Sequence, residues 1–264
     1  MKFSPRRELI ATLVKRELRT RYKGSSLGVL WSIITPLFMA IIYAFFFRLI
    51  AGVRAPTHSI IIGVFAWQFT ASSVNAGMMC ITGNSNLIKK VSFARWVLPA
   101  SVTLAGMIDY LISLLIQVAL VVFLLMKSEP AQMISWMVIF VPVVLIYHAV
   151  FNYGVALLLS SLNVYFRDTQ HFVNVALSAC FFLSPAMYDM AFVRASVGRH
   201  TWILDVYMLN PLTIAITWYR KLMIPDVAFE WTPWALAGLI WPFFFAAGAY
   251  VLFQRMQKNF ADYV

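Results

Sequence analysis

Long apolar stretches without charge constrain the fold of this chain more than any other feature. The first covers residues 28–47, where no charged side chain occurs over 20 residues. As an α-helix it is about 30 Å long, the thickness of the hydrocarbon core of a bilayer. With 62% hydrophobic and 12% charged residues, and a mean hydropathy of +0.80, the composition is not that of a soluble domain. We therefore predict an all-α membrane protein.

The other apolar runs predict five further spans, giving six transmembrane helices. We place the spans at residues 28–47, 59–81, 100–126, 131–164, 172–188 and 231–253. The fourth run is long enough to tilt or to kink at Pro142, and the fifth is short. Before the last span, a 14-residue apolar piece at 206–219 is interrupted by Asn210-Pro211 and is too short to cross. We interpret it as a re-entrant external hairpin.

A basic segment precedes the first span and predicts the orientation of the chain. Residues 1–27 are predicted to form an amphipathic interface helix, with Lys15, Arg16, Arg19 and Lys23 on one side and apolar residues on the other. Leaving out the long loop before the last span, Lys and Arg number 14 on the side of this segment and 3 on the other. Cationic loops stay in the cytoplasm, so both termini are predicted to be cytoplasmic.

The polar link between the second and third spans is predicted to form a helix on the cytoplasmic surface. Residues 82–99 are too short and too charged to cross the membrane. Apolar side chains that could seat in a partner's groove alternate there with cations that could meet its acidic rim or lipid phosphates: Leu87, Ile88, Lys89, Lys90, Val91, Phe93 and Arg95. The alternative is that these charges only mark the inner side.

Composition and motifs argue against several other functions. The net charge of +11 comes mostly from cations between apolar spans, which membrane lipid explains better than nucleic acid, so we expect no nucleic-acid partner. No G-x-x-x-x-G-K-[ST] sequence occurs, so we expect no ATP hydrolysis of the P-loop kind by this chain. Cys80 and Cys180 lack the spacing of metal ligands, and we predict neither a metal site nor a catalytic residue.

Asp109 is the sole acidic residue well inside a predicted span. A charge buried in lipid is expensive unless it is paired or faces water, so a proton or ion relay and an interhelical hydrogen bond or salt bridge both fit it. His148 and Asn152 lie one helical turn apart in the fourth span and fit either a ligand site or an interhelical polar contact.

Aromatic residues form 16% of the chain, and most tryptophans lie where an interfacial belt is expected. A minority could line a conduit in which ring faces stack on sugars, and we name Tyr43, Phe47, Trp67 and Phe69 for this role. After the fourth span, an adjacent arginine and aspartate can hold two span ends together or cap a helix, within the group Asn163, Tyr165, Phe166, Arg167 and Asp168.

Six motifs are spread over nearly the whole chain. They are residues 19–28 followed by Trp31 and Pro36, residues 86–91, Leu98-Pro99, residues 163–168, residues 182–185 and residues 210–212. Together they resemble the ABC-2 type permeases that export bacterial cell-surface polysaccharides, especially the O-antigen exporters. The resemblance treats residues 1–264 as a single transmembrane domain.

The resemblance implies a multi-pass permease of the bacterial inner membrane that moves a lipid-linked glycan out of the cytoplasm. It implies a homodimer docked on two separate ATPase subunits, which bind the ATP and Mg, so that this chain is not an enzyme and holds no cofactor. It also implies that the surface segment couples to the ATPase, that Asn210 and Pro211 belong to an outer gate, and that the cytoplasmic interface includes Arg19, Arg21, Tyr22 and Lys23.

The sequence departs from the family pattern at two places. Ala66 stands where relatives often have proline before a tryptophan, and Ala94 stands where they often have proline before an arginine. Capsule, teichoic-acid and small-molecule exporters remain alternatives within the family. Outside it, an intramembrane enzyme acting on lipid-linked glycans would need Asp109 and His148 as acid and base, and a proton-driven carrier would need Asp109.

Overall fold

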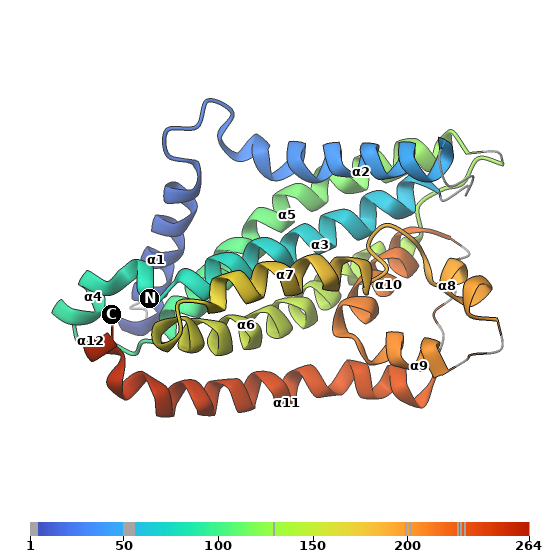
Figure 1. Ribbon diagram of the computed structural model, residues 1–264. Helices are drawn as coiled ribbons and strands as arrows, with labels where there is room; N and C mark the ends of the chain where they lie inside the picture. Colours follow the sequence, from blue (N-terminus) through green and yellow to red (C-terminus); the bar gives the residue numbers. More distant parts are fainter. Residues whose placement is uncertain are drawn as a thin grey trace.

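The structure is a computed structural model that describes residues 5–49, 56–128, 130–198, 200, 202–225, 227, 229 and 231–263. Every regular element in these ranges is helical, which confirms the prediction of an all-α protein. Five segments are long and apolar enough to cross a membrane. They run side by side (Figure 1) and are α2 (Trp31–Leu49), α3 (Thr57–Met79), α5 (Val97–Met126), α6 (Val141–Tyr165) with the preceding η3 (Trp136–Phe140), and α11 (Pro233–Met256).

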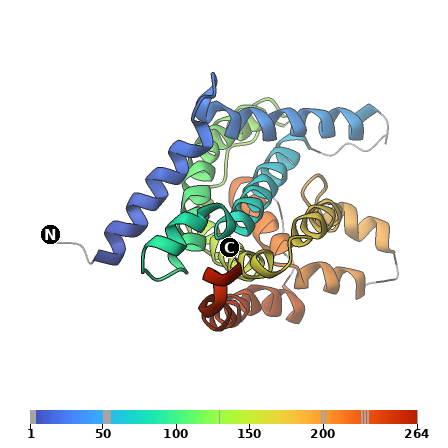
Figure 2. The same cartoon turned by 60° about the vertical axis from the view of Figure 1, so that its left-hand side comes forward.

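Helix α3 forms the centre of the bundle and α2 its edge. In its most apolar stretch, 72% of α3 is buried, whereas only 17% of the corresponding stretch of α2 is buried. Figure 2 shows α3 surrounded by neighbours and α2 lying outside it. Helices α3 and α6 approach closely because Gly77 has no side chain, since a Cβ there would lie 2.6 Å from the Ala156 Cβ.

Short helices cover the two ends of the bundle (Figure 1). Helix α1 (Pro5–Tyr22) crosses one end, where α4 (Ser85–Lys90), α12 (Phe260–Tyr263) and both chain termini also lie. At the other end lie α8 (Met190–Val197) and α9 (Trp202–Leu209), followed by α10 (Pro211–Met223), which inserts between the long helices. The remaining short elements are α7 (Thr169–Phe182), η1 (Gly28–Leu30), η2 (Thr82–Asn84) and η4 (Gln257–Asn259).

The fourth span differs from its prediction. Residues 131–135 are not helical, and α6 proper begins at Val141 after the η3 turns. Pro142 therefore lies in the first turn of α6, where its missing N–H costs nothing, and it does not kink a continuous helix. The prolines within helices are instead Pro36 in α2 and Pro242 in α11.

Two other predicted elements are shorter than expected. The surface helix predicted for residues 82–99 shrinks to α4 and a preceding η2 turn, because Val91 is extended and α5 already begins at Val97, with Pro99 in its first turn. At the predicted fifth span, residues 172–188, the helix α7 has 14 residues and a length of about 21 Å, and it ends at Phe182. It stops before Pro185, since a residue preceding proline is disfavoured in a helix.

Candidate functional site

A groove of about 450 Å³ lies between α2, α3 and α7. Its wall combines aromatic rings with side-chain amides, contributed by Tyr43, Trp67, Phe181, Phe182, Gln68, Asn75 and Asn174. Phe181 is the centre of the aromatic part, because its ring centroid lies 5.3 Å from that of Tyr43 and 5.4 Å from that of Trp67. The aromatic wall therefore joins three helices that are far apart in sequence.

Among the described residues, no charged side chain lines this groove. Amides both donate and accept hydrogen bonds, and aromatic rings offer flat apolar faces. A neutral, hydroxyl-rich chain can exchange hydrogen bonds along such a wall. The described wall carries no charge that would bind an ion in one place. The groove is thus chemically suited to contact with a sugar polymer.

The predicted conduit residues fall on two sides of α3. Tyr43 and Trp67 line the groove. Phe69 does not, since it is 3% exposed and stacks on Tyr110 at a centroid distance of 5.1 Å. Residues two apart on a helix point in nearly opposite directions, which separates Phe69 from Trp67. The side chain of Phe47 lies outside the described part of the structure.

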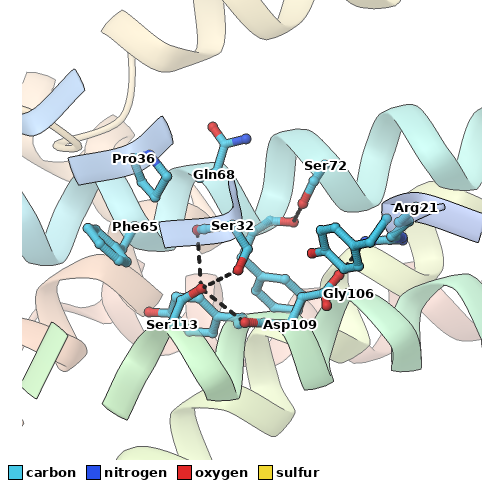
Figure 3. A pocket seen from close by; sticks show the side chains of 12 residues that line it. Arg21, Ser32, Pro36, Phe65, Gln68, Ser72, Gly106, Asp109 and Ser113 are labelled. Carbon is cyan, nitrogen blue, oxygen red and sulfur yellow. Dashed lines mark hydrogen bonds and ion pairs between the residues drawn. The ribbon is translucent and has the colours of Figure 1, made fainter. Parts of the chain in front are cut away.

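A second cavity, of about 210 Å³, lies where α1 meets α2, α3 and α5 (Figure 3). Arg21 at the end of α1 donates from Nη1 to the Asp109 Oδ2 at 3.0 Å, and its Nε pairs with Glu17 at 3.4 Å. Burial, and after it the negative charge of Asp109, raise the pKa of the Tyr22 hydroxyl in the same wall. The structure therefore favours the salt-bridge interpretation of Asp109.

Asp109 lies beside the beginning of α2, the first span, rather than beside its middle. One turn further along α5, the Ser113 hydroxyl donates to the Ser32 carbonyl in the first turn of α2 at 3.2 Å, as Figure 3 shows. Asp109 is thus level with the start of α2, and the three turns of α5 before it project about 18 Å further toward the end that carries α1. Sequence alone could not reveal this, because the level of Asp109 depends on how α5 packs against the start of α2.

His148 makes an interhelical polar contact. It is 1% exposed, and its Nε2 lies 2.6 Å from the Thr70 Oγ1 on α3. Asn152 is fully buried, and neither of its side-chain polar atoms has a hydrogen-bond partner in the described part of the chain. Among the described residues no group of three potential ligands could hold a metal ion.

The predicted coupling residues divide between surface and core. Lys89 and Lys90 are exposed and Val91 is 49% exposed, so these three face outward. Ile88 is 4% exposed and packs into this chain's own core, so it cannot contact a partner in this conformation. The other three are partly buried: Leu87, Phe93 and Arg95, whose guanidinium donates to the Gln257 carbonyl.

The predicted interface residues of α1 divide in the same way. Arg19 and Lys23 are exposed, whereas Arg21 and Tyr22 turn toward Asp109. Arg16, which was predicted on the basic face, donates to the Asn84 Oδ1 at 2.5 Å and so joins α1 to the segment before α4.

The group Asn163, Tyr165, Phe166, Arg167 and Asp168 lies at the end of α6 and just beyond it, and its first two members join the ends of several helices. The buried Asn163 donates to the Met78 carbonyl and to the Thr82 hydroxyl, both at 3.2 Å. Tyr165 donates to the Met256 carbonyl at 2.9 Å. The other three are exposed, and no hydrogen bond from the Asp168 side chain caps α7: Phe166, Arg167 and Asp168.

The outer hairpin consists of α9 and α10. The Asn210 Oδ1 accepts from the Leu212 N–H at 3.0 Å and caps α10, and Pro211 occupies the first helical position. In α10, 11 of 13 residues are buried. This burial was missed from sequence, where the apolar piece ended before Arg220.

Comparison with known proteins agrees with this geometry. Residues 8–224 match the sequence profile of the family described as ABC-2 type transporter. Two proteins from Klebsiella pneumoniae, each named O-antigen export system permease protein RfbA, are 32% and 30% identical over 219 and 222 residues, covering 82% and 83% of this chain and 80% and 82% of theirs. A protein of the same name from Myxococcus xanthus is 28% identical over 259 residues, covering 97% of this chain and 95% of its own.

Proposed function

The chain belongs to the ABC-2 type transporter family, and on that premise we propose that it is the permease subunit of an ATP-driven exporter of lipid-linked O-antigen. The relatives named O-antigen export permeases cover four fifths or more of both chains, which supports this cargo over a capsule polymer, a teichoic acid or a small molecule. The groove between α2, α3 and α7 is the observation that carries the proposal, because its uncharged wall of rings and amides suits a sugar chain.

Six crossings form part of the proposal. Both termini lie at one end of the bundle (Figure 1), so the chain crosses an even number of times, whereas five segments are long enough to span. Helix α7 starts at the end with the termini, and residues 183–189 lead on to α8 at the other end. About 21 Å of helix plus seven residues of less regular chain is sufficient for a full crossing.

We place this protein in the bacterial inner membrane with both termini in the cytoplasm, as the cationic end containing α1 and α4 suggests. A homodimer is supported by the sparse packing of α2, which forms part of the groove wall and leaves its own Phe38 and Phe45 each 61% exposed. Two copies facing each other would close the groove into a conduit. The proposed partners are a second copy, the lipid-linked glycan, membrane lipid and a separate ATPase subunit that binds ATP and Mg.

The geometry supports neither an intramembrane enzyme nor a proton-driven carrier. An enzyme using Asp109 and His148 would need them to converge, yet Asp109 pairs with Arg21 and His148 with Thr70 on another helix. A proton relay through Asp109 would need a neighbouring group that exchanges protons near neutral pH. The described partners of its carboxylate are Arg21, which does not titrate in the physiological range, and the Tyr22 hydroxyl, whose pKa is raised by burial above its ordinary value.

The proposal is tested by deleting the gene and complementing with variants of the groove. Deletion should abolish surface O-antigen and leave lipid-linked glycan inside the cell. Asn174→Leu keeps the size of an exposed groove residue but removes its hydrogen bonds, and should lower surface glycan about fivefold, equivalent to one lost hydrogen bond. The matched control is Val175→Leu, the next residue on α7, which is 71% exposed and outside the groove. Unchanged surface glycan in the deletion strain would contradict the function.

A further inference from the structure

Arg220 on α10 is a fully buried cation at the outer end of the bundle, 2% exposed. Its Nε donates to the Ser59 carbonyl in the first turn of α3 at 3.1 Å, and its Nη2 donates to the Ala186 carbonyl, in the segment after α7, at 3.2 Å. One side chain thus ties the second limb of the outer hairpin to two other parts of the chain, 161 and 34 residues away.

The charge of Arg220 is not used in an ion pair among the described residues. Asp189 attracts it from a distance, but that carboxylate accepts from the Phe192 N–H and caps α8. Burying a guanidinium without a paired anion costs free energy. We infer that Arg220 is present for the directions of its hydrogen bonds rather than for its charge. A planar fork of donors can bond two separate carbonyls at once, which a single ammonium cannot do equally well.

Gly63 shows how tightly these parts are packed. A Cβ at this position would lie 1.9 Å from the Ala186 carbonyl oxygen and 2.6 Å from the Arg220 Nη2. The backbone after α7 therefore rests directly on α3, one turn beyond Ser59, and the Arg220 side chain reaches into the same contact. Only glycine permits this approach.

Asn210 holds the same segment at the beginning of α10. Its Nδ2 donates to the Ser184 Oγ at 3.1 Å and to the Leu183 carbonyl at 3.4 Å. Residues 184–187 are all buried, and they follow Phe181 and Phe182 in the wall of the groove. The segment 183–187 is therefore attached to α10 at two points that lie ten residues, or about 15 Å, apart along the helix.

We propose that Arg220 is a positioning residue that fastens α10, the first turn of α3 and residues 183–187 into one body at the outer end of the conduit. The hairpin does not swing as an independent gate, because α10 can leave α3 and residues 183–187 only if both carbonyl bonds of Arg220 break. The outer end opens by movement of this body as a whole. The conduit itself rests on the proposed function, whereas the fastening of the three parts does not.

The test measures exposure of the first turn of α3 in the full-length protein in lipid nanodiscs. Ser59→Cys introduces a thiol at a position that is 6% exposed, in a background where the exposed Cys180 is replaced by serine and the buried Cys80 is kept. With Arg220 present, this thiol should react slowly with a water-soluble maleimide. Arg220→Met and Arg220→Lys should each accelerate labelling at least fivefold, and in cells without the cysteine changes each should lower surface glycan at least fivefold.

Lys221→Met, which removes the neighbouring cation on α10, is the matched control and should change neither readout. Wild-type behaviour of Arg220→Lys in both assays would mean that charge alone suffices and would overturn the two-carbonyl fastening. Slow labelling of Ser59→Cys in the Arg220→Met protein would overturn it as well. Should Arg220→Met fail to accumulate, Gly63→Ala, which displaces the Ala186 carbonyl while keeping Arg220, must give fast labelling. Failure of the proposed function would appear separately. Surface glycan would then be unchanged in the deletion strain, while the maleimide labelling of the Ser59→Cys variants would still follow the expected pattern.

Discussion

Asp109 and Arg21 form the ion pair that joins two helices in the described part of the chain. Both side chains are largely buried, with 10% and 17% of their surfaces exposed. A pair of this kind contributes little net stability when intact, but removing one member leaves the other charge buried without a partner. The pair fixes the end of α1 against α5 at the level where α2 begins.

Asp109→Leu should therefore lower the free energy of unfolding by about 3 kcal/mol, because the largely buried Arg21 loses its acceptor on α5 and keeps only Glu17 of its own helix as an ionic partner. Asp109→Asn keeps an acceptor and should retain most of the stability and of the export. Thermal unfolding of the detergent-solubilised variants and surface glycan provide the two measurements.

The double variant Arg21→Met with Asp109→Leu is the control for this prediction. It should recover more than half of the stability lost in Asp109→Leu, since neither charge of the pair between α1 and α5 remains, and Glu17, which loses Arg21, is the most exposed of the three side chains. A well-folded Asp109→Asn protein that does not export while the ATPase of the complex still runs would instead favour a relay role.

At the scale of elements, the segment from η2 through α4 to Val97 is the proposed link between the membrane helices and the ATPase. It is anchored to α1 through Arg16 and Asn84, to the end of α11 through Arg95 and the Gln257 carbonyl, and to the core through Ile88. Its outward residues include Lys89, Lys90 and Val91. A force applied to this segment would reach three parts of the bundle at once.

Lys89→Glu with Lys90→Glu should weaken the complex with the ATPase at least tenfold and lower export to match, because two exposed cations would become anions facing an acidic rim. Pull-down of the ATPase from solubilised membranes gives the measurement. Lys258→Glu, an exposed cation at the same end of the bundle, is the matched control and should bind normally. Wild-type pull-down and wild-type export by the double variant would contradict the coupling role.

Ile88→Ala should act on the other side of the same helix. Because Ile88 is 4% exposed within the permease core, its truncation should lower the free energy of unfolding by about 2–4 kcal/mol. Detergent thermal unfolding measures this loss, and binding of the ATPase to the folded fraction should remain at the wild-type level. A stable Ile88→Ala protein that fails to bind the ATPase would show that this residue turns outward in the complex.

At the scale of the whole molecule, the two ends of the bundle differ in what they carry. Both termini, α1 and α4 lie at one end, and α8 with α9 lies at the other (Figure 1). Helix α5 connects the two ends in a single run of 30 residues, from Val97 to Met126. The topology can therefore be tested with one thiol placed just beyond each end of α5.

Lys127→Cys should react with an impermeant maleimide in intact spheroplasts, and Asn86→Cys only after permeabilisation, since both positions are exposed and lie at opposite ends. Cys180 is exposed and must first be replaced, whereas Cys80 is buried and burial raises the pKa of its thiol, which keeps it unreactive. The reverse labelling pattern would invert the proposed orientation.

The helical membrane fold, its five longest spans and the family were accessible from sequence, because apolar length and charge bias act locally along the chain. The ends of the helices were harder to predict from sequence where no charged residue marks them. Pro142 lies in a first turn rather than at a kink, and α7 stops at Phe182 although the apolar run continues to 188. In both cases proline chemistry limits the helix, but hydropathy does not register it.

The candidate site shows the same division. Tyr43 and Trp67 could be named from sequence as aromatic residues in spans, whereas Phe69 lies on the other face of α3 and Phe181 joins the groove from a distant helix. Sequence by itself determined that this chain lies in a membrane and which end is cationic, because each residue meets lipid or water individually. Only the tertiary structure decided that Arg21 meets Asp109 and that Arg220 meets Ser59 and Ala186, because those contacts depend on how separate helices approach one another.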